Sequence, residues 1–197
     1  VKALGNLTFT PRAEFGEGGL ITSNPSGGND QFIDVVIDGD ILYATGFCTG
    51  CGNVGSGAYY TEAINVNTNE VVWATSSDPG TGFDIANTIS VDSDTVYISG
   101  YCEGCGDLGF YAFYTVALDK ETGAQRWDSI IDPGDRYDQV YDTTLSGDTL
   151  FLAGDCQDCA ADGSHEALIV ALDKLNGQEQ WRRNENISSG NDQAYGI

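Results

Sequence analysis

Short runs of apolar and polar residues, separated by turns, fill most of the chain, and no stretch keeps the spacing of an amphipathic helix. The middle of the chain shows this pattern most clearly, because each run there ends at residues that favour turns. We predict four strands, at residues 85–92, 95–101, 111–119 and 124–130. The segments between and after them are Asp92-Ser93-Asp94, a hairpin tip (102–109), a link (120–123) and the exit turn Asp132-Pro133-Gly134.

The same pattern recurs every 54 residues, without an insertion or deletion. Each unit repeats one tryptophan, one glycine, one alanine and one aspartate at fixed positions. These residues are Trp73, Trp127 and Trp181; Gly46, Gly100 and Gly154; Ala63, Ala117 and Ala171; and Asp30, Asp84, Asp138 and Asp192. Each unit is therefore expected to be one four-stranded module that stacks on its neighbours.

The second strand of each unit is apolar on both faces, as the segments 42–44, 96–98 and 150–152 show. A strand buried on both sides fits a sheet that lies between two other sheets, as a blade of a β-propeller does. A two-sheet sandwich would show cleaner alternation, and a β-solenoid has shorter coils that hairpins do not connect. We predict an all-β fold of β-propeller-type, four-stranded blades in tandem 54-residue repeats.

The two ends of the chain match parts of one unit. Residues 190–197 (GNDQAYGI) resemble residues 28–35 (GNDQFIDV), and residues 7–10 resemble the second strand at 42–45. We expect the two ends to share a blade, within one chain or between chains, unless the chain is a slice of a longer propeller. The expected single repeat domain, 1–197, comprises a partial blade (1–28), three blades (29–82, 83–136, 137–190) and the first strand of the shared blade (191–197).

Two sets of segments carry a resemblance to known repeats. The segments ALDKETGAQRW (117–127) and ALDKLNGQEQW (171–181) resemble the repeat of the pyrroloquinoline-quinone (PQQ) type propellers. The longer run DIANTISVDSDTVYISGYC (84–102) is similar to the bacterial seven-bladed propeller repeat, the SBBP family. The resemblance covers residues 29–197 and implies the propeller fold. Quinone-dependent dehydrogenases share these repeats, but their rings need more blades than this chain supplies.

Acidic residues dominate the charge, with 30 Asp and Glu against 8 Lys and Arg and a net charge of -22. Phosphate groups are bound by clustered Lys and Arg, so this balance argues against nucleic acid or an anionic membrane as a partner. No apolar run approaches the length of a membrane-spanning helix, so we expect no membrane insertion. The acidic surface favours solubility and divalent cations.

Six cysteines form one Cys-x-x-Cys pair per repeat: Cys48 and Cys51, Cys102 and Cys105, and Cys156 and Cys159. Haem attachment needs a histidine after the second cysteine, and none follows here. A structural zinc site would need two pairs in contact, and a thioredoxin-like redox pair would need a helix N-terminus. We favour a local disulfide in each hairpin, because a four-residue turn brings its ends within bridging reach. Such pairs indicate an oxidising, extracellular or cell-surface location.

The exits between blades and two sequons give further candidate sites. The carboxylates in the Gly-rich exits offer oxygen ligands for calcium. We favour the other interpretation, in which these aspartates cap the local turns through their own side chains. The four candidate calcium ligands are Asp78, Asp84, Asp132 and Asp138. Asn6 and Asn186 begin N-glycosylation triplets.

No arrangement of residues typical of a catalytic site stands out, because His165 is the only histidine and has no counterpart in the other repeats. We expect a non-enzymatic extracellular structural or interaction protein that binds copies of itself, with filament formation through strand sharing at the matching ends. It would need no cofactor other than calcium. The alternative is a secreted propeller that binds glycan or calcium, or a fragment of a larger secreted enzyme. The repeated tryptophans are expected to pack between blades and not to form a platform for sugars.

Overall fold

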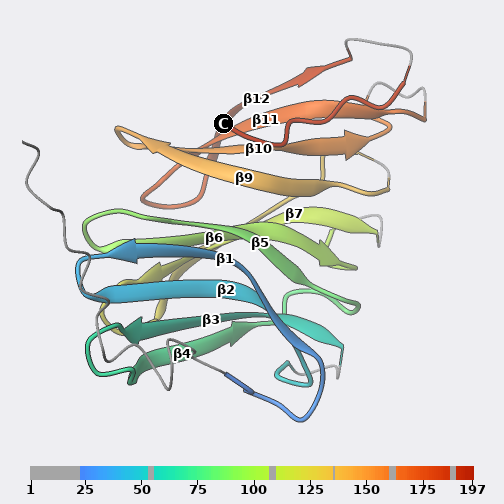
Figure 1. Ribbon diagram of the computed structural model, residues 1–197. Helices are drawn as coiled ribbons and strands as arrows, with labels where there is room; N and C mark the ends of the chain where they lie inside the picture. The colour runs from blue at the N-terminus through green and yellow to red at the C-terminus, as the bar shows by residue number, and fades with distance from the viewer. Residues whose placement is uncertain (1–22, 53–55, 107–109, 135, 160–162, 187–189) are drawn as a thin grey trace, which may run out of the picture.

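Three four-stranded antiparallel sheets make up the computed structural model, which describes residues 23–52, 56–106, 110–134, 136–159, 163–186 and 190–197 (Figure 1). No helix occurs in these ranges. The first sheet contains β1 (Asp30–Asp38), β2 (Ile41–Thr49), β3 (Gly57–Asn65) and β4 (Val71–Ser77). The second sheet contains β5 (Ile85–Val91), β6 (Thr95–Glu103), β7 (Tyr111–Asp119) and β8 (Gln125–Ile131). The third sheet contains β9 (Gln139–Ser146), β10 (Thr149–Gln157), β11 (His165–Asp173) and β12 (Glu179–Glu185). The predicted all-β fold of four-stranded units is confirmed.

The sheets repeat each other in their irregularities as well as in their strands. The first strand of each sheet has a β-bulge, and the residues that the pairing skips are Ile33, Asn87 and Tyr141. A second register shift separates the third and fourth strands beside the alanine of each repeat, at Ala63, Ala117 and Ala171. A bulge bends its strand and changes the local twist. Because the bulges recur at equivalent positions, the three repeats share the same backbone conformation as well as the same sequence spacing.

The sheets stack face to face, with the first strands β1, β5 and β9 next to one another (Figure 1). One hydrophobic cluster fills the space between the first and second sheets, and a second cluster fills the space between the second and third. Strand β6 contributes to both, because Val96 and Ile98 face the first sheet and Tyr97 faces the third. The apolar second strand of this repeat is thus buried on both sides, as its sequence predicts.

A tryptophan ties each sheet to the next. The indole Nε1 of Trp73 donates a hydrogen bond to the Lys120 carbonyl at 3.0 Å, and Trp127 donates to Lys174 in the same way. The ring of Trp73 covers Gly123, where a Cβ atom would lie 2.7 Å from the indole Cδ2. Gly123 also has a φ of +71°, so both the contact and the backbone conformation favour glycine.

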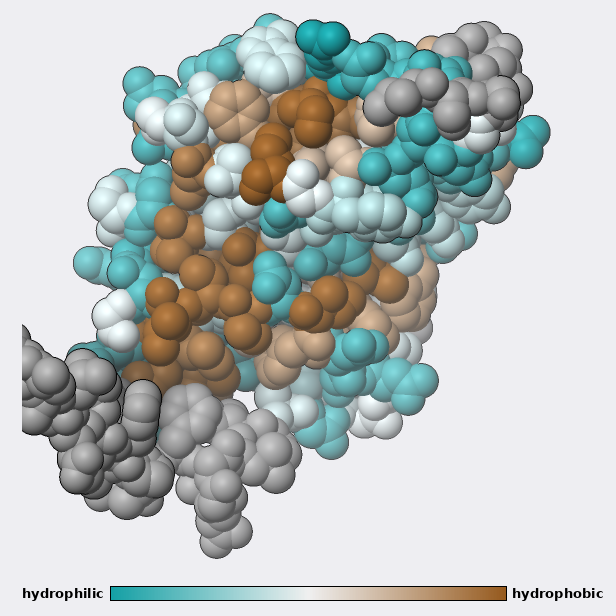
Figure 2. Space-filling model, turned by 45° about the horizontal axis from the view of Figure 1, so that its top comes forward, coloured by the Kyte–Doolittle hydropathy of each residue, from teal (hydrophilic) through white to brown (hydrophobic). Residues whose placement is uncertain are grey.

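Trp181 differs from its two counterparts because no further sheet covers it in the described part of the chain. Its exposed fraction is 47%, against 8% for Trp73. The expectation that every repeated tryptophan packs against a neighbouring repeat therefore fails for this residue. Val35 and Ile37 on β1 are likewise exposed by 55% and 58%. Figure 2 shows hydrophobic residues gathered across the middle of one face of the molecule.

The last described residues take the place of a further first strand, although they form no strand themselves. The Ile197 N–H donates to Oδ2 of Asp142 at 3.0 Å, just as the Ile89 N–H donates to Oδ2 of Asp34. The Asp192 N–H donates to the His165 carbonyl at 2.7 Å. The predicted partner of this segment, residues 7–10, lies outside the described residues. A search of the described residues found no helix that meets the length and hydropathy needed to cross a membrane.

Replacing Trp73 with alanine tests the contact between sheets. We expect Trp73→Ala to lower the free energy of unfolding by about 3–5 kcal/mol, because it empties a buried site. The matched control, Trp181→Ala, should cost less than about 1 kcal/mol in this chain, since that side chain is half exposed. Urea unfolding followed by far-ultraviolet circular dichroism measures both. Equal losses in the two variants would contradict the account.

Candidate functional site

The cysteine pairs lie where the second and third strands of each sheet meet. The Cα atoms of the three pairs are 5.6, 5.8 and 5.9 Å apart, and the sulfur atoms are within disulfide distance. The third turn residues, Gly50, Gly104 and Asp158, all have positive φ values, as the sequence predicts. The first cysteine of each pair is fully buried and the second is partly exposed.

The aspartates that open the second and third repeats are fully buried at the exits between blades. Asp84 accepts a hydrogen bond from the Gly80 N–H at 3.2 Å and another from the Glu103 N–H at 2.9 Å. Asp138 accepts in the same way from Gly134 and Gln157, both at 3.0 Å. Each carboxylate therefore ties its exit loop to the end of the second strand in the same sheet.

A second carboxylate stands near each of these buried aspartates. The pKa of Asp84 is raised to about 7, mainly by burial; the two N–H donors lower it and the Asp78 carboxylate raises it. Burial raises the pKa of Asp138 to about 7 as well, with added contributions from Asp132 and Asp155. The exits thus hold carboxyl groups that change charge near neutral pH.

The structure brings the four candidate calcium ligands together only in pairs, Asp78 with Asp84 and Asp132 with Asp138. Calcium usually takes six or more oxygen ligands, and the buried member of each pair already accepts two N–H bonds. This geometry matches the turn-capping role. Calcium binding at the exits stays a prediction. Glycosylation also stays a prediction, since Asn186 is exposed and Asn6 lies outside the described residues.

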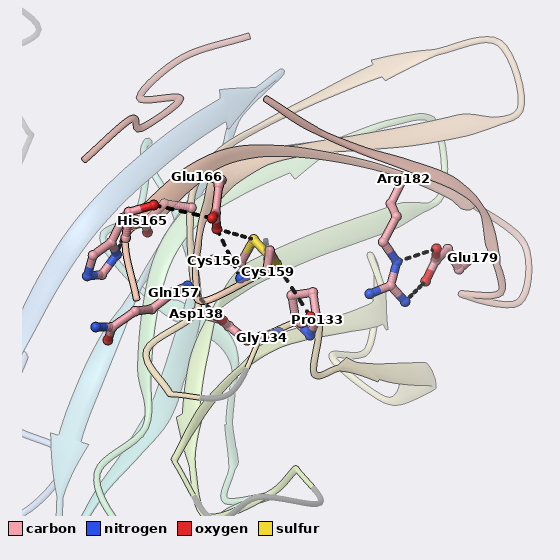
Figure 3. Close-up of a disulfide and its surroundings, with 12 residues drawn as sticks. Pro133, Gly134, Asp138, Cys156, Gln157, Cys159, His165, Glu166, Glu179 and Arg182 are labelled. Atoms are coloured by element: carbon pink, nitrogen blue, oxygen red, sulfur yellow. Dashed lines mark hydrogen bonds and ion pairs between the residues drawn. A yellow bond between two sulfur atoms is a disulfide. The ribbon is translucent and has the colours of Figure 1, made fainter. Parts of the chain in front are cut away.

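An open groove of about 860 Å³ separates the fourth strand of the second sheet from a turn of the third sheet. Its polar walls include Asp128, Asp132 and Glu179, together with Arg182. The Glu179 carboxylate holds the Arg182 guanidinium through two hydrogen bonds of 2.6 and 2.7 Å (Figure 3). The groove is therefore lined by charged and polar groups of both donor and acceptor kinds.

The third repeat departs from the other two at its hairpin end. His165 Nδ1 lies 2.6 Å from Oδ2 of the buried Asp155, and Gln193 donates to the same oxygen at 2.9 Å. Burial, and then the Asp155 carboxylate, raise the pKa of the adjacent Tyr141. A histidine oriented by a buried carboxylate is suited to proton transfer.

The sequence analysis missed this pair because it considered His165 alone. The signal was available in the repeat itself: Asp155 occupies the position of Phe47 and Tyr101, and His165 occupies that of Gly57 and Tyr111. In the second sheet the equivalent Tyr101 and Tyr111 stack with ring centroids 4.5 Å apart. An aromatic contact is thus replaced by a polar one in the third sheet.

Solved structures similar to this one are propeller proteins, whereas no protein-family model and no curated protein match the chain. A quinohemoprotein alcohol dehydrogenase, ADHIIG, from Pseudomonas putida HK5 is 15% identical, with a TM-score of 0.50 over 76% of this chain and 26% of that one. The quinohemoprotein alcohol dehydrogenase from Comamonas testosteroni is 18% identical, with a TM-score of 0.50 over 76% and 20%. BamB from Moraxella catarrhalis is also 18% identical, with a TM-score of 0.39 over 76% and 50%.

The two dehydrogenases, each with a TM-score of 0.50, confirm the propeller-like fold, and at such identities they show the fold alone. The chain spans only about a quarter of the dehydrogenases that it resembles. The expectation of a non-enzymatic, filament-forming structural protein is wrong, because the two neighbours with a TM-score of 0.50 are enzymes and nothing supports a filament. The alternative, a fragment of a larger secreted enzyme or a ligand-binding propeller, agrees better. The cysteine pairs are compatible with an extracellular or surface location.

Peptide mapping without reduction tests the three cysteine pairs. We expect disulfides Cys48–Cys51, Cys102–Cys105 and Cys156–Cys159, because each pair closes its own turn. Mass spectrometry should find each pair within a single peptide that is lighter by two hydrogen atoms than its reduced form. Free thiols at all six positions in protein purified without reductant would refute the assignment.

The buried carboxyl groups predict a specific pH dependence. A carboxyl group whose pKa is raised by folding makes its full contribution to stability below its ordinary pKa of 3.8, and that contribution is lost progressively as the pH rises to about 7. We therefore expect Asp84→Asn to flatten the decline in the free energy of unfolding between about pH 4 and pH 7. The control is Asp148→Asn, at an exposed position. Urea unfolding at several pH values gives the slopes, and identical slopes for Asp84→Asn and the parent would refute the prediction.

Proposed function

We propose that this chain is a three-blade section of a larger secreted propeller enzyme, in which further blades cover both end faces. The observation that carries the proposal is the exposure, at each end of the stack, of side chains that the inner interfaces bury. The section would serve as scaffold, holding the hairpin ends and exit loops of its blades in a fixed arrangement for the site that the complete protein builds.

The end face on the third sheet supports this proposal through Trp181. At the two inner interfaces the equivalent indoles donate their N–H to a backbone carbonyl of the following sheet. Trp181 has Phe151 beside it, at a centroid distance of 5.9 Å, just as Trp73 has Tyr43 at 5.9 Å. The third sheet thus presents an aromatic pair equivalent to the one that packs the first sheet against its neighbour.

The end face on the first sheet supports it from the other side. Val35 occupies the repeat position of Ile89, which is 6% exposed because it packs against the first sheet. Ile37 occupies the position of Val91, which also packs against that cluster. The side chains that a preceding blade would cover are therefore already in place on β1.

The relation to enzymes rests on the fold of the neighbouring structures, which are much longer than this chain. Their names refer to a quinone and a haem. Covalent haem attachment does not fit the sequence of this section, because Gly52, Gly106 and Ala160 follow the cysteine pairs where a histidine is needed. The role proposed for the residues of this section stays that of a scaffold, and the partners, which are glycan, calcium or copies of the chain, stay predictions.

Hydroxyl-radical footprinting of the native protein tests the proposal. We expect the peptide that contains Trp181 to be oxidised readily in the isolated 20.9 kDa chain and to be protected several-fold in the native protein. The Trp73 peptide is the internal control, since it should be protected in both. A native species of the same mass as this chain, with Trp181 still reactive, would contradict the proposal. Protection that appears in the isolated chain as its concentration rises would assign the end faces to copies of itself instead.

A further inference from the structure

Three potential metal ligands meet at the hairpin end of the third sheet: Cys156, Cys159 and Glu166 (Figure 3). One ligand atom from each lies within 4.8 Å of the other two. Oε2 of Glu166 lies 3.8 Å from Sγ of Cys156 and accepts a hydrogen bond from the Cys159 N–H at 3.0 Å. Among the described residues, this is the only grouping of three His, Cys, Asp or Glu side chains that could hold a metal ion.

Glu166 is the residue that sets the third hairpin apart. It pairs with Cys156 across β10 and β11, and the equivalent partners of Cys48 and Cys102 are Ala58 and Ala112. Its side chain is fully buried. A carboxylate costs free energy when it is buried, so its presence where two other repeats carry alanine indicates a role that alanine cannot fill.

We propose that the third hairpin is a redox-gated zinc site, formed by Cys156, Cys159 and Glu166 once a thiol has reduced the disulfide. Two thiol groups of the reductant join as a disulfide, and their two electrons break the Cys156–Cys159 bond. Their two protons pass to the cysteine sulfurs, and both protons leave to water when the thiolates bind the metal. This site is independent of the proposed scaffolding function.

The ligand chemistry favours zinc. Two thiolates are soft ligands that select zinc over calcium, and a carboxylate oxygen is a common additional zinc ligand. Three protein ligands leave the fourth position of a tetrahedral ion for water or another small molecule. The first and second hairpins supply only two ligands each, because an alanine methyl group lies where Glu166 lies in the third.

Existing contacts hold the carboxylate in place for this role. The Cys159 N–H binds Oε2, and the Ser164 hydroxyl donates to Oε1 at 3.3 Å. The opposite side of the pair is also defined, since Sγ of Cys159 lies 3.4 Å from the Pro133 carbonyl. None of these contacts to Glu166 is made by a sulfur atom, so the position of the third ligand does not depend on the S–S bond.

Zinc titration of the reduced chain of 197 residues tests the proposal. The parent for the test carries serine at Cys48, Cys51, Cys102 and Cys105, so that only the third pair binds metal. After reduction with a phosphine, isothermal titration and native mass spectrometry should show one zinc ion per chain, which excess calcium does not displace. Glu166→Ala, which restores the residue of the other repeats, should weaken zinc binding at least about tenfold. Equal affinity in the two proteins, or no zinc retained by the parent, would overturn the proposal.

Hydrogen–deuterium exchange of the natural sequence provides a second test that does not depend on the serine substitutions. With all three pairs reduced, added zinc should protect the third hairpin, residues 155–166, more strongly than the equivalent residues 47–58 and 101–112. Glu166→Ala should remove this difference. Equal protection of the three hairpins in the natural sequence would also overturn the proposal, because it would show that the carboxylate adds nothing to the cysteine pair.

Discussion

The packing of a tryptophan on the turn of the following blade is the contact on which the structure depends. Trp73 covers Gly123 and binds the Lys120 carbonyl, and Trp127 repeats the arrangement on Gly177. The tryptophan of one blade and the glycine turn of the next must lie at matching positions, which explains why the 54-residue spacing admits no insertion. A stack built in this way has two unlike apolar end faces, because each is shaped for another blade and not for water.

The hairpin ends are under less constraint, and the chemistry of the protein gathers there. The third repeat has the same tryptophan, bulges and opening aspartate (Asp138) as the other two repeats. At its hairpin end, however, it carries Asp155, His165 and Glu166, which the other repeats lack. Loops held by a rigid scaffold commonly carry function. The repeat therefore acts as an internal reference, and positions where one copy differs from the others identify candidate sites.

The strands and their order could be predicted from the sequence because apolar alternation, turn residues and the repeat all point to the same four-stranded unit. The buried Asp84 follows the same logic, since an aspartate that opens every repeat suggests a structural role. The pair of Asp155 with His165 could not be found by motif, because its members come from different strands and meet only through the β10–β11 register. The exposure of Trp181 likewise depends on what covers the last sheet, which a local pattern does not contain.

The structure of the complete native protein, determined by crystallography or electron microscopy, tests the central claim most directly. The account predicts that the Trp181 indole lies over a turn residue of a following blade and donates its N–H to a backbone carbonyl there, as Trp73 does to Lys120. It also predicts that Val35 and Ile37 are buried against a preceding blade. A native protein in which Trp181, Val35 and Ile37 all face solvent would contradict it.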